Sequence, residues 1–223
     1  MSNRILAVAV AAALSVPVAA RADEVATAGT VARPPFALVS GETNAPGVGF
    51  VYGKFGWPSI DVGYQYGVNE KFDAGVALSL LYGFQGTSTT QFGIGLNAPL
   101  RTTVLRREKI SVQVIVTPGL EVYTSSPAIF GLNLPVGAIL GVQITPELRV
   151  AVGADLNLKI LFAGDPFGTH LLIGPAFGPA VEYYIDKNLA VSFDTRFGPV
   201  LFTGNYNGGS FGFRTQVGVA YRM

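Results

Sequence analysis

Apolar and polar residues alternate along most of this chain. In the stretch PSIDVGYQYG, residues 58–67, the side chains of Ile60, Val62, Tyr64 and Tyr66 share one face. The alternation resumes at Phe72 and continues through residue 85. Successive side chains of a β-strand point to opposite faces, whereas a helix repeats every 3.6 residues. A period of two over about ten residues therefore predicts strands.

The same alternation predicts ten strands in all. They lie near residues 47–56, 58–67, 72–85, 91–101, 110–123, 130–144, 148–162, 170–185, 189–202 and 210–223. Their connections fall into two alternating classes: polar turns (VNEK, RTTVLRREK, TPE, DKN) and loops rich in Gly, Ser, Thr and Asn (GWPS, GTSTT, TSSPAI, AGDPFGT, TGNYNGG). This order is typical of an up-and-down antiparallel barrel, and it leaves eight or twelve strands open.

The two faces of these strands differ in composition. The apolar face carries valines, leucines and phenylalanines, and Lys54 is the only charge that we place on it. The other face carries acids, bases and amides diluted by glycine. A soluble β-sandwich also has alternating strands, but a water-facing surface would hold more lysine and less glycine. We therefore predict an all-β fold, a single closed antiparallel transmembrane β-barrel with apolar residues outside and polar residues inside.

Aromatic residues cluster near the expected strand ends. Rings of this kind favour the interface between lipid and water, where they form two girdles. The residues that we assign to these girdles are Trp57, Tyr66, Phe72, Tyr82, Phe130, Tyr183 and Tyr221.

The first residues predict export. Arg4 precedes an apolar run from Ile5 to Leu14, and small residues follow up to Ala22. This is the layout of a secretory signal peptide over residues 1–22, too short to span a bilayer as a helix. Residues 23–46 have no strong pattern and are expected to form a linker or a short plug, and residues 47–223 the barrel.

Charge is scarce in this chain. Only 13% of residues are charged, and removal of residues 1–22 takes two of the 15 basic residues and none of the 14 acidic ones, which leaves a formal charge of −1. A nearly neutral chain offers no electrostatic basis for binding nucleic acid.

The turn around YGVNEKFDAG and the final stretch FGFRTQVGVAYRM carry a resemblance. Together with the alternating strands, they resemble the small, porin-like outer-membrane β-barrel proteins of diderm (Gram-negative) bacteria. The resemblance implies a location in the outer membrane, contact with lipid and lipopolysaccharide, and polar turns in the periplasm. It also implies recognition of the last strand by the barrel-assembly machinery through Phe213, Val217, Val219 and Tyr221, although Met223 stands where the family favours phenylalanine.

Charged residues on the inward face indicate a function. The acids Asp61, Glu121, Asp155 and Asp194 can be matched by Lys159, Arg196 and Arg214. We assign a lumen constriction to five of them: Asp61, Asp155, Asp194, Arg196 and Arg214. Such a constriction biases ion passage, and we expect a narrow, weakly selective pore for ions or small solutes. The alternative is a closed structural or adhesive barrel in which these charges form a salt-bridged plug.

Candidate catalytic chemistry is sparse. His170 is the only histidine, Asp165 precedes it, and the chain has no cysteine. This composition disfavours a transition-metal site, and we expect no metal, no cofactor and no enzymatic activity. An enzyme at the barrel rim is a distant alternative.

Five prolines conflict with a regular barrel. Pro118, Pro135, Pro175, Pro179 and Pro199 fall within expected strands. Proline removes a hydrogen bond of the strand ladder, and a closed barrel has no free edge to accommodate it. We expect bulges or bends at these positions, and a slip of the side-chain facing beyond them.

Overall fold

The computed structural model describes residues 34–83, 91–125, 128–164, 168–204 and 207–223, so that the expected signal peptide lies outside the described residues. Thirteen antiparallel strands form one sheet. They are β1 (Gly49–Trp57), β2 (Ser59–Asn69), β3 (Phe72–Leu81), β4 (Gly93–Asn97), β5 (Leu100–Arg106), β6 (Ile110–Val116), β7 (Gly119–Tyr123), β8 (Ile129–Asn133), β9 (Val136–Gln143), β10 (Leu148–Ala163), β11 (Thr169–Tyr184), β12 (Leu189–Gly204) and β13 (Gly208–Arg222).

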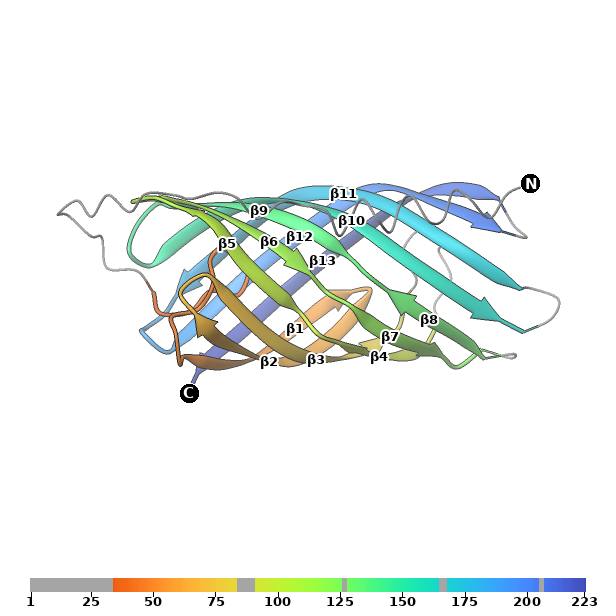
Figure 1. The fold of residues 1–223 in the computed structure, drawn as a ribbon, viewed down its shortest axis with the longest axis horizontal. Coiled ribbons are helices and arrows are strands. Elements are labelled where there is room, and N and C mark those ends of the chain that lie inside the picture. The colour runs from red at the N-terminus through yellow and green to blue at the C-terminus, as the bar shows by residue number, and fades with distance from the viewer. Residues whose placement is uncertain (1–33, 84–90, 126–127, 165–167, 205–206) are drawn as a thin grey trace.

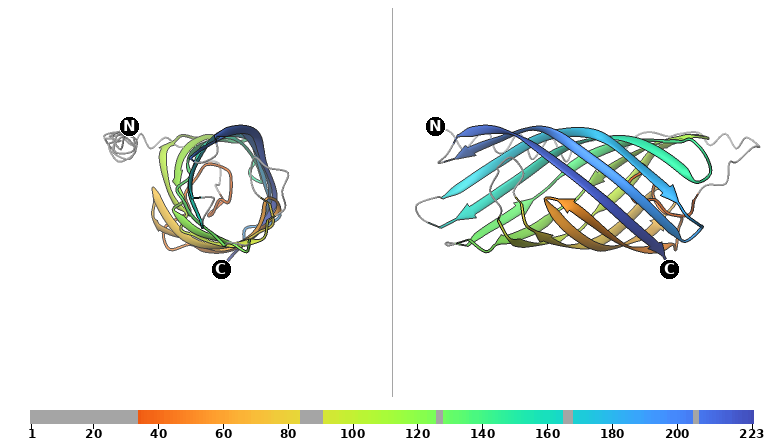
Figure 2. Two further views of the ribbon diagram at one scale, coloured as in Figure 1. Left: turned by 90° about the vertical axis from the view of Figure 1, so that its right-hand side faces the viewer. Right: turned by 180° about the vertical axis from the view of Figure 1, so that it is seen from behind.

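The sheet closes on itself because β1 pairs with both β2 and β13. Strands β4 and β5, β6 and β7, and β8 and β9 each form one pass that is broken in two, so the thirteen strands make ten passes. The expected ten-stranded, all-β antiparallel barrel is therefore confirmed. Figure 1 shows it from the side, and Figure 2 shows the closed ring. No helix among the described residues is long and apolar enough to cross a membrane.

The three breaks coincide with prolines and lie side by side. Each break lies beside one proline: Pro99, Pro118 or Pro135. The residue before each proline donates its N–H to the next pass: Ala98 to the Pro118 carbonyl (2.8 Å), Thr117 to the Pro135 carbonyl (2.9 Å) and Leu134 to the Leu158 carbonyl (2.8 Å). A proline has no N–H with which to continue the ladder. The expectation of bends at Pro118 and Pro135 is confirmed, and Pro99 adds a third that the sequence analysis did not single out.

The expectation of bulges or bends is wrong for Pro175, Pro179 and Pro199. Pro175 and Pro179 lie inside the continuous β11, and Pro199 lies inside β12. The β11–β12 register is the same on both sides of them, from Ile173↔Leu201 to Ala180↔Asp194. No slip in facing follows the prolines: odd-numbered residues point inward on both sides of Pro99, Pro118 and Pro135, and even-numbered residues do so on both sides of Pro175, Pro179 and Pro199. The register shifts lie elsewhere, between Gly67 and Asn69 and between Thr103 and Leu105.

The outer surface of the barrel is apolar. Large hydrophobic side chains are exposed on every pass, among them Val62, Leu96, Leu132, Val152 and Val217. Most of the buried polar and charged side chains point into the lumen instead. This arrangement, apolar outside and polar inside, is typical of a barrel that spans a membrane.

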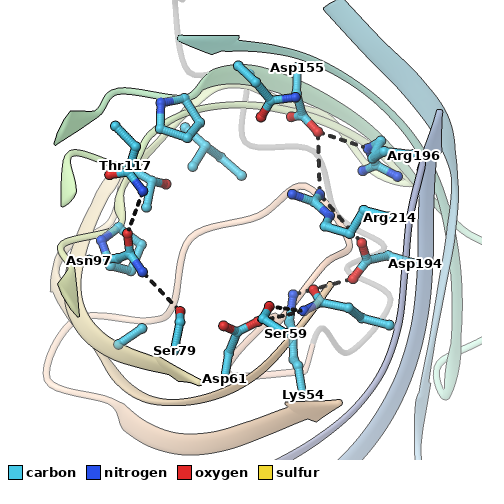
Figure 3. Close-up of a pocket in the computed structure, with 18 of the residues that line it drawn as sticks. Lys54, Ser59, Asp61, Ser79, Asn97, Thr117, Asp155, Asp194, Arg196 and Arg214 are labelled. Carbon is cyan, nitrogen blue, oxygen red and sulfur yellow. Dashed lines mark hydrogen bonds and ion pairs between the residues drawn. The ribbon is translucent and has the colours of Figure 1, made fainter. Parts of the chain in front are cut away.

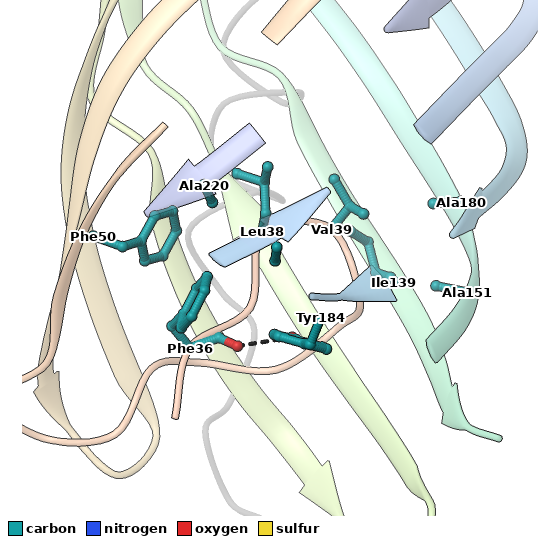
Figure 4. Close-up of a cluster of buried hydrophobic side chains, with 10 residues drawn as sticks. Phe36, Leu38, Val39, Phe50, Ile139, Ala151, Ala180, Tyr184 and Ala220 are labelled. Atoms are coloured by element: carbon teal, nitrogen blue, oxygen red, sulfur yellow. Dashed lines mark hydrogen bonds between the residues drawn. The ribbon is translucent and has the colours of Figure 1, made fainter. Parts of the chain in front are cut away.

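The lumen is filled at one end. We call this the turn end, because the short turns after β2, β5, β9 and β11 and the end of β13 lie there; the opposite end is the loop end (Figure 1). Residues 36–44 lie inside the barrel at the turn end, where Phe36, Leu38 and Val39 pack with Phe50 and Tyr184 in a buried cluster (Figure 4). We call residues 34–46 the inner segment.

Candidate functional site

A cavity of about 290 Å³ lies in the lumen between the inner segment and the loop end. Its lining comes from all ten passes and from Leu38 and Val39 of the inner segment. Figure 3 shows the charged and polar side chains arranged around this space. All five side chains that the sequence assigned to the constriction line this cavity.

Four of the five side chains form one ion-pair network. Asp155 Oδ2 lies 3.2 Å from Arg196 Nε and 3.4 Å from Arg214 Nη2. Arg214 Nη2 also lies 3.5 Å from Asp194 Oδ1, and Lys54 Nζ lies 3.4 Å from Asp194 Oδ2. The network joins β1, β10, β12 and β13 across one side of the lumen (Figure 3).

The fifth, Asp61, is held by neutral donors. Gln216 Nε2 donates to Asp61 Oδ2 at 2.5 Å, and Ser59 Oγ donates to the same oxygen at 3.1 Å. Asp61 therefore lines the same cavity but stands beside the ion-pair network.

Lys54 faces the lumen, which corrects its assignment to the apolar face. Its neighbours Gly53 and Phe55 face outward, and Phe55 is 63% exposed. In the sheet Lys54 lies opposite Asp61, which itself points inward. β1 is rich in glycine and has a weak alternation of its own, so its pairing partners, and not its sequence, determine its facing.

A second buried pair lies on the far side of the cavity. Lys159 Nζ lies 2.6 Å from Glu121 Oε2, and the same carboxylate accepts hydrogen bonds from the Tyr123 hydroxyl (2.7 Å) and Asn133 Nδ2 (2.7 Å). The sequence had matched these two charges only as members of the inward set. A row of neutral groups continues from here, since Asn133 donates to Asn97, which donates to Ser79.

The charged groups differ in how far the cavity reaches them. The side chains of Arg214, Lys159 and Lys54 are 30%, 20% and 18% exposed, whereas those of Asp194 and Glu121 are 3% and 7% exposed. Asp155, whose side chain is 15% exposed, and the half-buried Asp61 are reached as well, so that the cavity presents accessible charges of both signs.

Apolar side chains close the lumen toward the loop end. Leu81, Tyr123, Leu161, Leu172 and Val200 form a second buried cluster. These residues occupy the inward positions that the alternation predicts, but they are apolar. The expectation of a polar lumen therefore holds only between them and the turn end. We call these residues the apolar chamber.

Barrel side chains bind the inner segment through charge. Arg101 Nη1 donates to the Ala37 carbonyl at 2.8 Å, while its Nε and Nη2 lie 2.7 and 2.8 Å from the two carboxylate oxygens of Asp73. Glu182 accepts the backbone N–H groups of Leu38 (2.8 Å) and Val39 (3.2 Å).

Two further contacts fix the far part of the segment. Arg149 Nη1 lies 3.1 Å from Glu42 Oε2. Gly141 permits close approach, because a Cβ there would lie 1.8 Å from the Ser40 carbonyl oxygen. Sequence reasoning missed this site, since residues 34–46 show no periodicity. The inward-facing Asp73, Arg149 and Glu182 near the turn end were the one available signal.

The residues assigned to the aromatic girdles occupy both ends of the barrel. Tyr66, Tyr183 and Tyr221 are exposed at the turn end, and Phe130 is exposed toward the loop end. Trp57, Phe72 and Tyr82 are half-buried, and the Trp57 ring packs on the rings of Tyr82 and Phe213. Their depth in a membrane stays a prediction.

The remaining predicted residues lie on the outside or at the rim. Phe213, Val217, Val219 and Tyr221 share the outward face of β13, and their recognition by an assembly machinery stays a prediction. His170 is the second residue of β11 and pairs with Gly204, and Asp165 lies outside the described residues.

Comparison with known proteins gives a likeness of fold. No family model matches the chain, and no curated protein matches it. Among solved structures, the outer membrane protease OmpT from Escherichia coli is similar, with 11% sequence identity and a TM-score of 0.46 over 79% of this chain and 93% of that one.

This comparison corrects one expectation. The sequence analysis expected no enzymatic activity, yet a similar solved barrel is a protease. A barrel of this kind therefore does not exclude catalysis, and the exclusion is withdrawn. At 11% identity the likeness concerns the fold alone and assigns no activity to this chain.

Proposed function

We propose that the protein is an outer-membrane β-barrel with a narrow ion path, which the inner segment closes at the turn end. In this proposal residues 1–22 direct export, the apolar outer surface faces lipid and lipopolysaccharide, and the turn end faces the periplasm. Ions cross only when the inner segment leaves the lumen.

The position of the inner segment is the observation that carries the proposal. Its side chains from Phe36 to Val39 are at most 8% exposed, and Asn44 is fully buried. The segment ends at β1 but has no place in the sheet, so its displacement would leave every strand pair intact.

The charged cavity supports passage beyond this segment. It is polar on several sides, reaches about 290 Å³, and presents accessible charges of both signs, the most exposed of which is Arg214. Charged rings of this type bias the passage of ions by their sign. The network of Lys54, Asp155, Asp194, Arg196 and Arg214 would form the constriction of the open path.

A closed structural barrel is the second candidate. Its support is the pairing of the lumen charges and the apolar chamber above them, since paired charges and apolar side chains both resist the entry of ions. The two candidates differ in one respect, namely whether displacement of the inner segment produces a current.

A reversible crosslink separates them. The side-chain oxygens of Thr43 and Thr103 lie 3.0 Å apart, and the chain has no cysteine of its own. In Thr43→Cys/Thr103→Cys a disulfide would hold the inner segment in the lumen. Single-channel current is recorded in planar bilayers from refolded residues 23–223, oxidised and then reduced.

The expected result is no current from the oxidised variant and current steps after reduction. As a control, Val191→Cys/Val219→Cys joins two paired residues on the outer face of β12 and β13 and should behave like the native chain in both states. Equal currents with and without the disulfide would overturn the gating role. Silence of the folded, reduced protein would favour the closed barrel.

A further inference from the structure

Strands β11 and β12 are joined incompletely in their middle. Cα partners are assigned at Ile173↔Leu201, Phe177↔Phe197 and Ala180↔Asp194, but not at residues 174–176 or 178–179, all of which the structure describes. The flanking β10–β11 and β12–β13 pairs are continuous over the same stretch. Besides the three breaks in β4–β9, the barrel wall is therefore interrupted here, at what we call the β11–β12 seam.

Prolines cause the interruption. Continuity of the register places Pro175 opposite Pro199 and Pro179 opposite Thr195. Neither proline of the first pair has an N–H, so that neither can donate to the other's carbonyl. The two strands nevertheless lie close together: a Cβ added to Gly198 would lie only 2.0 Å from the Pro175 carbonyl oxygen.

Side chains from the lumen supply donors that the ladder lacks. Arg196 Nη1 donates to the carbonyls of Thr195 (2.8 Å), Gly178 (2.9 Å) and Pro179 (3.2 Å). Asn157 Nδ2 donates to the Gly174 carbonyl at 3.1 Å. Side chains thus reinforce the seam, where Phe177↔Phe197 is the one strand pair assigned between residues 174 and 179, and these side chains can rotate away without unfolding a strand.

The lumen face of the seam carries little bulk. Gly174, Ala176, Gly178 and Gly198 point inward there, and a small pocket between them is lined both by Arg196 and by the outward-facing Pro199. On the lumen side, opening of the seam therefore requires only one large side chain, Arg196, to move; on the outer side the rings of Phe177 and Phe197 must part.

The seam connects two apolar surroundings. On the lumen side Leu172 and Val200 of the apolar chamber flank it. On the outer side the rings of Phe177 and Phe197 lie 4.7 Å apart, and Phe177 is 55% exposed. A transmembrane strand needs about 9–11 residues; counted from Tyr183, that span includes residues 174–179.

We propose that the β11–β12 seam is a lateral passage through which a single-chain anionic amphiphile, such as a fatty acid, moves between the bilayer and the lumen. Its tail would part the packed side chains of the apolar chamber, which are at most 7% exposed in the closed barrel. Its head would reach the cavity, where Arg214, Lys159 and Lys54 are the most exposed cations. Arg196 acts as a latch, because it closes the seam and is itself held by Asp155. This passage shares the cavity with the ion path proposed above, but it rests only on the location of the barrel in a membrane and not on displacement of the inner segment.

Photolabelling of the native chain tests the passage directly. The refolded protein is placed in liposomes that contain a fatty acid with a diazirine at the end of its tail. After irradiation the labelled residues are mapped by mass spectrometry. We expect labels on Leu161, Leu172 or Val200 in addition to the outward Phe177. Labels confined to outward residues would overturn the proposal, and this experiment needs no variant.

A crosslink across the seam tests the route. In Pro175→Cys/Pro199→Cys the two thiols are joined by dibromobimane, which becomes fluorescent only when both have reacted. Val181→Cys/Phe193→Cys joins the same two strands on the same face, where their pairing is intact. We expect the first crosslink to reduce labelling of the apolar chamber at least fivefold and the second to leave it unchanged. Undiminished labelling behind a closed seam would show entry by another route and overturn the passage.

Discussion

Replacement of Arg101 by alanine should strongly destabilise the barrel. Arg101 is 5% exposed and holds Asp73 with two nitrogens, at 2.7 and 2.8 Å. A third nitrogen binds the Ala37 carbonyl of the inner segment. One side chain therefore joins β3, β5 and the inner segment at the turn end.

The expected magnitude follows from what the substitution leaves behind. Removal of one partner from a buried ion pair costs about 3–5 kcal/mol, because the other charge remains buried. Asp73 keeps hydrogen bonds from Gln65 Nε2 (2.6 Å) and from the Asn44 N–H (3.0 Å). These reduce the penalty, so that we expect a loss near the lower end, about 3 kcal/mol. In Asp73→Ala/Arg101→Ala no charge is orphaned, and the double variant should lose about 2 kcal/mol less than the sum of the single losses.

Urea unfolding in detergent micelles measures these losses. Trp57 is the only tryptophan, so its fluorescence reports on one site of the barrel. Arg106→Ala is the matched control: Arg106 is exposed and donates one hydrogen bond to Thr43 Oγ1 at 3.1 Å, and its loss should cost under about 1 kcal/mol. If Arg101→Ala costs no more than Arg106→Ala, or if the double variant is additive, the proposed coupling is refuted.

Three further predictions concern the lumen wall and its charges. Arg196→Ala should destabilise the barrel by about 3 kcal/mol through the loss of a buried ion pair. Arg196→Lys should restore only part of this stability, because lysine lacks the several N–H donors of the guanidinium group. Urea unfolding measures both variants, and equal stability of the two would contradict the role of these donors. Gly198→Ala should destabilise the barrel by about 1–3 kcal/mol through overpacking, because the added Cβ would meet the Pro175 carbonyl oxygen. An unchanged midpoint of urea unfolding would show that β11 and β12 can separate there without cost. Lys54→Met removes a cationic partner of Asp194. When it is added to the Thr43→Cys/Thr103→Cys variant, the selectivity of any current seen after reduction should shift toward cations. An unchanged reversal potential in a salt gradient would place Lys54 outside the ion path.

Local chemistry made much of this fold predictable. Strand alternation depends only on the geometry of the extended chain, so that Val62 and Asp61 were assigned to opposite faces correctly. The breaks at Pro118 and Pro135 were predictable for the same reason, because a proline lacks its N–H in every context. The inward set of Asp155, Asp194, Arg196 and Arg214 followed from the same periodicity.

What the sequence by itself determined is therefore the local part: strands, their faces, and the charges that must share a lumen. Only the tertiary structure decided the rest. Leu38 meets Glu182 across 144 positions of sequence, and a segment without periodicity carries no local sign of such a contact. Lys54 points inward because its sheet partners do, and Pro199 comes to lie opposite Pro175 through the register of the β11–β12 hairpin. These features depend on which residues the closed barrel brings together, and pairing between distant segments is a property of the whole fold and not of any one stretch.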